Sequence, residues 1–340
     1  MLSRNETLLS LNDVTLIPAT ISYIESRKQC ATRVYDGMLP LFAAPMSCVI
    51  DDNNWKTFKE NGVRAVVPRS IDFSKRLELA TQTFVAVGLD EMKKIAEMPT
   101  FSKKNFICVD IANGHMESLY MICRKAKERH GENISIMTGN IANPETYKWI
   151  CSNHPGVIDY IRVGIGNGNV CTTSANTAIH YPMASLISHI YAIKSWNYPC
   201  PKIVADGGFT NFDQIIKALA LGADYVMLGK IFAKTEESCA NYIYDEDGEP
   251  VYDENGNRVK EYYGMSTKKA QKEFGGGGLK TAEGISTTVS VEYKLSQWVN
   301  NFESFLKSAM SYTGKQTILS FIGDVTLMQM TNSAYSSYFK

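Results

Sequence analysis

The sequence of 340 residues has no excess of charge of either sign and no long apolar run. Its 35 Lys and Arg residues balance 35 Asp and Glu residues, so the composition indicates neither a nucleic-acid partner nor an anionic membrane partner. No apolar segment is long enough to cross a bilayer. Residues 1–6 lack the apolar core of a signal peptide. We therefore expect a cytoplasmic protein.

Closely spaced cysteine pairs are also missing. The chain contains no C-x-x-C pair, which argues against a zinc site or a disulfide framework and for reduced thiols in a cytosol. Most of the cysteines are expected to be small buried residues. The eight cysteines are Cys30, Cys48, Cys108, Cys123, Cys151, Cys171, Cys200 and Cys239.

Cys171 stands apart because it follows a short apolar run and a glycine-rich loop. Residues 164–173 read Gly-Ile-Gly-Asn-Gly-Asn-Val-Cys-Thr-Thr. Glycines let backbone groups approach a ligand or ion closely, and a thiolate held on such a loop is a candidate nucleophile. The G-x-G-x-G spacing, with no helix directly after it, argues against a Rossmann turn. Taken alone, this stretch is also compatible with a purely structural loop.

Eight short and mostly apolar runs recur along the chain, as is typical of parallel strands buried on both faces. The predicted strands are Leu39–Met46, Arg64–Pro68, Phe84–Gly88, Phe106–Ile111, Ile134–Thr138, Tyr160–Ile165, Lys202–Asp206 and Tyr225–Leu228. Amphipathic helices are predicted between them, among others at Met116–Arg129, Pro144–Asn153, Pro182–Lys194 and Phe212–Leu221. Asn143 and Asn211 are expected to be N-caps. The length allows one large barrel or two domains, and eight such units predict an α/β protein with a (β/α)8 TIM barrel.

Active sites of this fold lie on the loops that follow the strands. In the sequence, Arg69 follows the second predicted strand, Asp110 the fourth and Cys171 the sixth. Asp206-Gly207-Gly208 ends the seventh strand and Gly229-Lys230 follows the eighth, where barrels commonly bind phosphate through backbone N–H groups.

Two segments after the last strand stand outside the barrel pattern. Tyr242–Tyr262 contains Asp247-Gly248 and Asn255-Gly256, which are strong turn signals, and we expect a polar β-hairpin that projects from the barrel. Gly275–Gly278 is a run of four glycines, which disfavours a packed element. It predicts a mobile active-site flap, with a surface loop as the alternative.

Taken together and in this order, the motifs resemble those of the IMP dehydrogenase/GMP reductase family, and the resemblance covers nearly the whole chain. The motifs that carry it are Ala44-Pro45-Met46, Val109-Asp110-Ile111-Ala112-Asn113-Gly114, Gly139-Asn140, the Cys171 loop, Ala205-Asp206-Gly207-Gly208, Ala218–Asp224, Val226-Met227-Leu228-Gly229, Tyr263-Gly264-Met265-Ser266 and Glu283-Gly284.

Three features make the chain look most like a GMP reductase. Phe73–Lys104 leaves no room for the regulatory domains usually inserted in dehydrogenases, so residues 1–340 are expected to form a single barrel domain. Dehydrogenases carry an Arg-Tyr pair that activates water, yet no Arg lies between Met265 and Glu283. The Asp-x-Ala-Asn-Gly and Gly-Met-Ser motifs resemble the reductase versions. The alternative is an IMP dehydrogenase that lacks regulatory domains and converts IMP to XMP with NAD.

The resemblance implies a reaction in two steps. Cys171 attacks C2 of GMP, ammonia leaves, and a covalent thioimidate remains. NADPH then delivers a hydride to C2, and IMP is released. Thr173 and Glu283 match the pair that moves protons for the departing amine.

The resemblance also implies ligand contacts and an assembly. The implied substrate-binding residues are Asp206, Gly207, Gly208, Gly229, Lys230, Gly264, Met265, Ser266 and Gly284. The implied NADPH-binding residues are Ser26, Arg27, Arg69, Asp110, Ile111, Ala112, Ile165, Gly166, Ser308 and Ser311. Carbonyls of Gly166, Gly168 and Cys171 match a monovalent-cation site for K⁺. Ser308–Ser311 match a stretch contributed by a neighbouring subunit, and a homotetramer is expected.

Four positions depart from the family pattern. Ser47 stands where Asp is usual, and Ser174 stands where Arg usually follows Cys-Thr-Thr. Lys230 replaces a small residue at the phosphate, and Arg69 replaces Lys.

Overall fold

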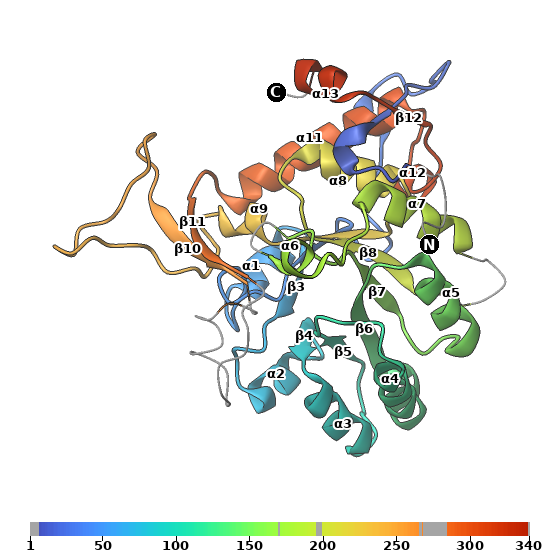
Figure 1. The fold of residues 1–340 in the computed structure, drawn as a ribbon, viewed down its shortest axis with the longest axis vertical. Helices are drawn as coiled ribbons and strands as arrows, with labels where there is room; N and C mark the ends of the chain where they lie inside the picture. Colours follow the sequence, from blue (N-terminus) through green and yellow to red (C-terminus); the bar gives the residue numbers. More distant parts are fainter. Residues whose placement is uncertain (1–6, 169–170, 195–198, 265–266, 268–283, 339–340) are drawn as a thin grey trace.

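The computed structural model describes residues 7–168, 171–194, 199–264, 267 and 284–338, and its centre is a closed barrel of parallel strands (Figure 1). The strands follow one another around the barrel in chain order, which confirms the predicted (β/α)8 fold. They are β2 (Leu41–Ala43), β3 (Arg64–Val67), β4 (Phe84–Val87), β5 (Asn105–Val109), β6 (Ile134–Ile141), β7 (Tyr160–Val163), β8 (Lys202–Asp206) and β9 (Tyr225–Leu228). The prediction Leu39–Met46 extends beyond β2 at both ends. By contrast, β6 continues three residues beyond its predicted end at Thr138.

Helices cover the outside of the barrel (Figure 1). They are α1 (Trp55–Glu60), α2 (Phe73–Leu79), α3 (Leu89–Glu97), α4 (Glu117–His130), α5 (Pro144–Asn153), α6 (Thr173–Thr177), α7 (Met183–Ile193), α8 (Phe212–Ala220), α9 (Lys230–Ala233), α11 (Leu295–Tyr312), α12 (Ile318–Phe321) and α13 (Asn332–Tyr338). Short 3₁₀ turns are η1 (Leu11–Asp13), η2 (Arg27–Gln29) and η3 (Gly131–Asn133). The four helices predicted by range, now α4, α5, α7 and α8, are confirmed to within one residue at each end.

The two predicted helix caps differ in outcome. The Asn143 side chain accepts a hydrogen bond from the Glu145 amide at 3.0 Å, as an N-cap should. Asn211 occupies the N-cap position of α8 as predicted, but its side chain accepts no capping hydrogen bond. Gln214 accepts the Thr210 amide at 2.8 Å instead, and it fixes the chain just before α8.

Two layers of apolar side chains build the core. The larger layer lies between the strands and the helices and includes fully buried Val85 and Ile107. The smaller one fills the barrel near the amino ends of the strands, where aromatic rings meet edge to face. Its rings include Phe42, Phe84 and Tyr225. The Phe42 ring centroid lies 5.6 Å from that of Phe84 and 5.3 Å from that of Tyr225.

The chain ends and the segment after β9 lie outside the barrel. β1 (Val14–Leu16) pairs antiparallel with β12 (Leu327–Gln329) and so joins the two ends of the chain. β10 (Val259–Tyr263) pairs antiparallel with β11 (Ser286–Ser290) and forms the base of a projection. Within the described part of the chain, no helix is long and apolar enough to cross a membrane.

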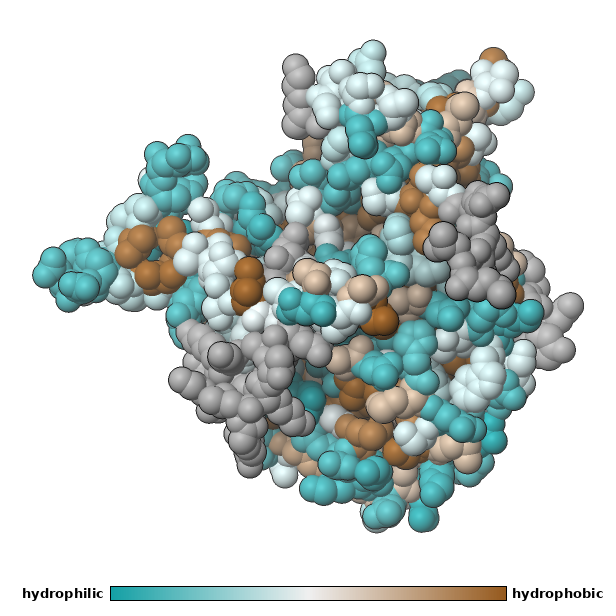
Figure 2. Space-filling view, in the orientation of Figure 1, coloured by the Kyte–Doolittle hydropathy of each residue, from teal (hydrophilic) through white to brown (hydrophobic). Residues whose placement is uncertain are grey.

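The predicted projection is confirmed, but its form as one hairpin was wrong. Residues 242–258 reverse direction twice, and Figure 1 shows two prongs. Asp245 accepts the Asp247 amide at 3.0 Å, and Asp253 accepts the Asn255 amide at 2.9 Å. Each turn signal therefore closes its own reversal. Figure 2 shows that the tips of both prongs are hydrophilic. The flap predicted around Gly275–Gly278 lies outside the described residues.

Candidate active site

A cleft of about 330 Å³ opens at the carboxyl ends of the barrel strands. Its lining residues come from the carboxyl ends of four strands, β3, β5, β6 and β7, and they include predicted catalytic and predicted cofactor residues. Its lining is Arg69, Asp110, Ile111, Ala112, Asn140, Arg162, Gly164, Ile165, Gly166, Cys171 and Thr173. Its size falls within the usual range for small-molecule sites, about 300–1,000 Å³.

The Cys171 thiol lies in this cleft beside a hydroxyl group. Its Sγ donates to Oγ1 of Thr173 at 3.3 Å, and its amide donates to the Gly168 carbonyl at 3.0 Å. A β-bridge pairs Cys171 with Gly284, so the chain after β9 returns to the thiol. Glu283, directly before Gly284, lies outside the described residues.

The other cysteines differ from Cys171 in their surroundings. Five of the eight are buried, as expected from the sequence, whereas Cys171 is half-buried. Burial raises the pKa of Cys108 and of Cys123 to about 12, and it also raises the pKa of Cys151 and of Cys239. A thiol with a raised pKa supplies little thiolate. Cys200 and Cys239 are half-buried like Cys171, but they do not line the cleft, so position favours Cys171 as the nucleophile.

Glycines shape the loop that carries Cys171. Gly166 has φ +74°, and a Cβ there would lie 2.6 Å from the Cβ of Ser174. Ser174 donates its hydroxyl to the Gly166 carbonyl at 3.0 Å, which fixes the loop to α6. Gly208 has φ +86°, and a Cβ there would lie 2.7 Å from the Asn167 carbonyl oxygen. The loops after β7 and β8 thus need glycine to pack together.

Arg162 joins two predicted site residues, and the sequence reasoning gave it no role. Its guanidinium lies 2.6 Å from Oδ1 of Asp110 and 2.8 Å from Oδ2 of Asp206. Burial alone would lower the pKa of Arg162, but Asp206 and Asp110 raise it well above its ordinary value. The arginine is therefore always charged and holds both carboxylates, of which Asp110 lines the cleft. A charged residue inside the apolar strand Tyr160–Val163 was the available signal.

Asn140 is the second residue without a predicted role. Its side-chain amide donates to Oδ2 of Asp206 and to the Gly164 carbonyl, each at 2.8 Å. Both Arg162 contacts to Asp206 also end on Oδ2. Among the described residues no group donates to Oδ1 of Asp206, so this oxygen is available to a ligand hydroxyl.

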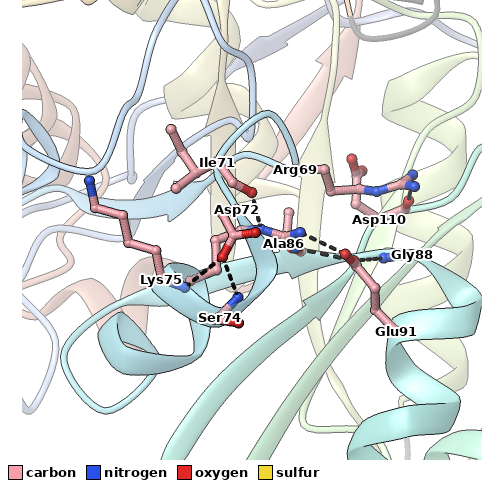
Figure 3. A network of polar contacts seen from close by, with 10 residues as sticks. Arg69, Ile71, Asp72, Ser74, Lys75, Ala86, Gly88, Glu91 and Asp110 are labelled. Atoms are coloured by element: carbon pink, nitrogen blue, oxygen red, sulfur yellow. Dashed lines mark hydrogen bonds and ion pairs between the residues drawn. The ribbon is translucent and has the colours of Figure 1, made fainter. Parts of the chain in front are cut away.

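Arg69 lines the cleft, and the ion pair of Arg76 with Glu91 lies close to it (Figure 3). A Cβ at Gly88 would come within 2.8 Å of Nη2 of Arg69, so the glycine makes room for the guanidinium. Glu91 accepts the Gly88 amide at 2.8 Å and pairs with buried Arg76 at 2.7 Å. Burial would raise the pKa of Glu91, but hydrogen bonds from Arg76 and Gly88 hold it below its ordinary value. Arg69 itself donates only weakly, to the Asp110 carbonyl at 3.5 Å.

The predicted phosphate residues lie on the neighbouring loops after β8 and β9, which pair with each other. At Gly229 a Cβ would lie 2.7 Å from the Met46 sulfur and 3.3 Å from the Tyr262 hydroxyl. Lys230 is half-buried and begins α9. The remaining predicted base-binding residues, Met265 and Ser266, lie outside the described residues.

Four predicted cofactor residues do not line the cleft. Arg27 in η2 donates to the Ser308 hydroxyl in α11 at 3.0 Å, and Ser26 accepts the Lys28 amide at the start of η2. The Ser311 carbonyl accepts the Ser22 hydroxyl at 2.7 Å. This surface borders a separate cavity of about 320 Å³, lined by Arg27, Lys28, Asn300, Glu303, Ser304 and Lys307. One chain therefore does not gather all the predicted cofactor residues in one place.

The predicted cation ligands already take part in hydrogen bonds. The Gly166 carbonyl accepts the Ser174 hydroxyl, and the Gly168 carbonyl accepts the Cys171 amide. A carbonyl oxygen has a second lone pair, so each of these two carbonyls can still accept one further contact. Over the described ranges, no group of three or more His, Cys, Asp or Glu side chains has a metal-binding arrangement.

The fold and this cleft define a class of protein, a (β/α)8 barrel with a thiol and two arginine-bound carboxylates at its carboxyl end. Residues 8–337 match the family model for the IMP dehydrogenase / GMP reductase domain, and the chain belongs to this family of oxidoreductases. The resemblance noted in the sequence is thus confirmed.

Proteins of similar sequence agree with this assignment. The chain is 30% identical to the GMP reductase of Lysinibacillus sphaericus (strain C3-41), over 97% of this chain and 98% of the relative. It is 33% identical to the GMP reductase of Buchnera aphidicola subsp. Baizongia pistaciae (strain Bp), over 69% and 64% of the two chains. It is 29% identical to the GMP reductase of Caenorhabditis elegans, over 72% and 64%.

Proposed function

We propose that this protein is an NADPH-dependent reductase that converts GMP to IMP and ammonia. The observation that carries the proposal is the Cys171 thiol, 3.3 Å from the Thr173 hydroxyl, in a cleft that also contains Asp110 and Arg162. The relatives named above, all GMP reductases, support the same reaction.

The thiol provides a covalent route for this reaction. The Cys171 thiolate attacks C2 of the guanine ring and forms a C–S bond. The bond between C2 and the exocyclic nitrogen then breaks, and the nitrogen takes up a proton and leaves as ammonia. A thioimidate remains on the protein. NADPH, when bound, supplies the hydride that C2 accepts, after which the C–S bond breaks with its electron pair on sulfur and IMP is released.

Two residues are assigned to proton transfer. The Thr173 hydroxyl accepts a hydrogen bond from the Cys171 thiol, which supports a role for it in passing a proton near the reacting carbon. Glu283 precedes Gly284, the residue that bridges Cys171. A carboxylate and a hydroxyl at this point suit a relay to the departing amine.

The nucleotide contacts follow from the strand ends. Oδ1 of Asp206 is assigned to the ribose hydroxyls, because Arg162 and Asn140 occupy Oδ2. Backbone groups of the glycine loops, together with Lys230, are assigned to the 5′-phosphate. The phosphate set is Gly207, Gly208, Gly229 and Lys230, and the base set is Gly264, Met265, Ser266 and Gly284.

The cofactor contacts involve two surfaces. The nicotinamide side is assigned to Asp110, Ile111, Ala112, Ile165 and Gly166, and Arg69 is assigned to the 2′-phosphate. Ser26, Arg27, Ser308 and Ser311 are assigned to the cofactor site of a neighbouring chain in a cytoplasmic homotetramer. Their position on a surface separate from the cleft supports this arrangement. The carbonyls of Gly166, Gly168 and Cys171 are assigned to K⁺.

Product analysis tests the reaction. Incubation with GMP and NADPH is expected to consume one NADPH for each IMP and each ammonia formed. Incubation with IMP and NAD serves as the control for a dehydrogenase. Production of XMP with reduction of NAD, and no ammonia from GMP, would contradict the proposal and support the dehydrogenase alternative.

Subunit complementation tests the shared site. Cys171→Ala and Arg27→Glu chains are each expected to be inactive with NADPH. When the two are mixed and reassembled, activity is expected to return, because some sites then combine an intact thiol with an intact Arg27 surface. A fully active monomer in light scattering, or no recovery from reassembled mixtures, would exclude the shared site.

A further inference from the structure

A second cavity, of about 340 Å³, lies at the opposite end of the barrel from the Cys171 cleft. It opens at the amino ends of β3, β4, β5 and β7. It shares no lining residue with the cleft. Its lining is Asp36, Met38, Lys59, Arg64, Ala65, Thr81, Gln82, Thr83, Phe84, Phe106 and Tyr160.

Aromatic rings form one wall of this cavity. The Phe84 ring centroid lies 5.3 Å from that of Phe106 and 5.4 Å from that of Tyr160. Phe84 is buried, but Phe106 and Tyr160 are half-buried and leave ring surface open to the cavity. The buried rings are sufficient to fill the barrel interior. The exposed ring surface of Phe106 and Tyr160 is therefore available to contact a flat ligand.

The charges at the mouth favour an anion. Both carboxylate oxygens of Asp36 lie 2.7 Å from Nη2 of Arg64, so these two charges compensate each other. Lys59 remains as the uncompensated charge in the lining. Among the described residues, its ammonium donates one hydrogen bond, to the Gln82 carbonyl at 3.1 Å. An ammonium carries three protons, so two are available to a ligand.

We propose that this cavity binds a planar aromatic anion. The rings of Phe106 and Tyr160 stack against the aromatic part, and the Lys59 ammonium binds the anionic group. Thr81 and Gln82, which are exposed at the rim, add polar contacts. The site does not depend on the reaction proposed for the Cys171 cleft.

The fluorescent probe 8-anilinonaphthalene-1-sulfonate combines fused rings with one negative charge and is suited to the test. It is titrated into the full-length protein with saturating GMP and NADP⁺, so that nucleotides occupy the Cys171 cleft. We expect one bound probe with an affinity in the micromolar range, of order 1–100 μM.

Three variants locate the bound probe. Thr81→Trp fills the cavity mouth and is expected to weaken binding at least about tenfold. Lys59→Glu reverses the rim charge and is expected to weaken binding about two- to tenfold, less at high salt. Ser118→Trp, an exposed position on α4 outside both cavities, is the matched control and should leave binding unchanged.

The outcomes separate this proposal from the proposed function. Weaker binding in Thr81→Trp and Lys59→Glu, with unchanged probe binding in Ser118→Trp, supports the second site whether or not the protein turns over GMP. Equal probe affinity in the wild type and both variants would overturn the proposal. Absence of saturable probe binding would also overturn it.

Discussion

The two ends of the barrel each hold an arginine paired with aspartate, but they use it differently. At the carboxyl end, Arg162 lines the cleft and bridges Asp110 and Asp206. At the amino end, Arg64 pairs with Asp36 and lies over the Tyr225 ring, 5.0 Å from its centroid. The first arginine positions groups for a ligand, whereas the second covers an aromatic plug. Residue type alone does not assign the role, because the role depends on the surroundings.

The same contrast applies to stability. Burying the charges around Arg162 gains little net free energy, because desolvation offsets the ion pairs. The rings around Phe84 bury apolar area and meet edge to face, which stabilises the barrel. We therefore expect substitutions around the Cys171 cleft to affect chemistry, and substitutions of the buried rings at the amino end to affect stability without affecting chemistry.

The largest effect is expected from Cys171→Ala. Removing the nucleophile should lower turnover by about three orders of magnitude or more, while GMP still binds. The control is Cys200→Ala, because Cys200 is also half-buried but lies outside the cleft. Steady-state rates and GMP binding by calorimetry measure the two effects. Turnover of Cys171→Ala within a factor of two of wild type would remove the thiol from the mechanism.

Arg162→Met should affect both stability and chemistry. The substitution leaves Asp110 and Asp206 buried without their cation, and we expect a loss of about 3–5 kcal/mol in the free energy of unfolding. Because Asp206 is then no longer held in place, the KM for GMP should also rise. Denaturant unfolding and kinetics check the two effects. Arg162→Lys keeps the positive charge and should recover part of the stability and part of the affinity for GMP. An Arg162→Met protein with normal stability and normal KM would contradict the bridging role.

Phe84→Ala should lower stability without changing activity, and so distinguish the role of the amino end of the barrel from that of the carboxyl end. It removes a central ring of the amino-end cluster, and we expect a loss of about 3–5 kcal/mol in the free energy of unfolding. The activity of the remaining folded protein should stay unchanged at low temperature. Phe305→Ala is the control, because that ring is 49% exposed on α11. A drop in turnover without a loss of stability would show that the aromatic cluster takes part in the chemistry.

A smaller effect is expected from Arg69→Ala. A charge-assisted hydrogen bond contributes roughly 1.5–3 kcal/mol, so the preference for NADPH over NADH should narrow by about one to two orders of magnitude. Lys75→Ala is the control, because Lys75 is an exposed cation nearby that pairs with Asp52. The ratio of kcat/KM for the two cofactors is the measurement. If that ratio does not change, Arg69 does not contact the 2′-phosphate.

The sequence was a good guide to the barrel because its strands are buried on both faces. Such strands appear as short apolar runs, and helices between them show a regular apolar stripe. The projection was less predictable. Its two turn signals were visible, but the pairing of β10 with β11 joins segments separated by more than twenty residues. Local signals do not determine such a pairing.

The motifs predicted which residues lie together at the carboxyl end of the barrel, and Cys171, Asp110 and Arg69 do line one cleft. Their roles in the reaction stay predictions. The role of Arg162 depends on three strands meeting at one point, which no local pattern records. The amino-end cavity has the same origin, because its walls come from strand starts far apart in the chain.

Covalent labelling tests the central claim most directly. A purine nucleotide with chlorine at position 2 should react with the nucleophile by forming a C–S bond and releasing chloride. Intact-mass analysis and peptide mapping are expected to find one adduct per chain, on Cys171, and GMP should slow its formation. Labelling of another cysteine, such as Cys239, or an active protein that forms no adduct on Cys171, would contradict the account.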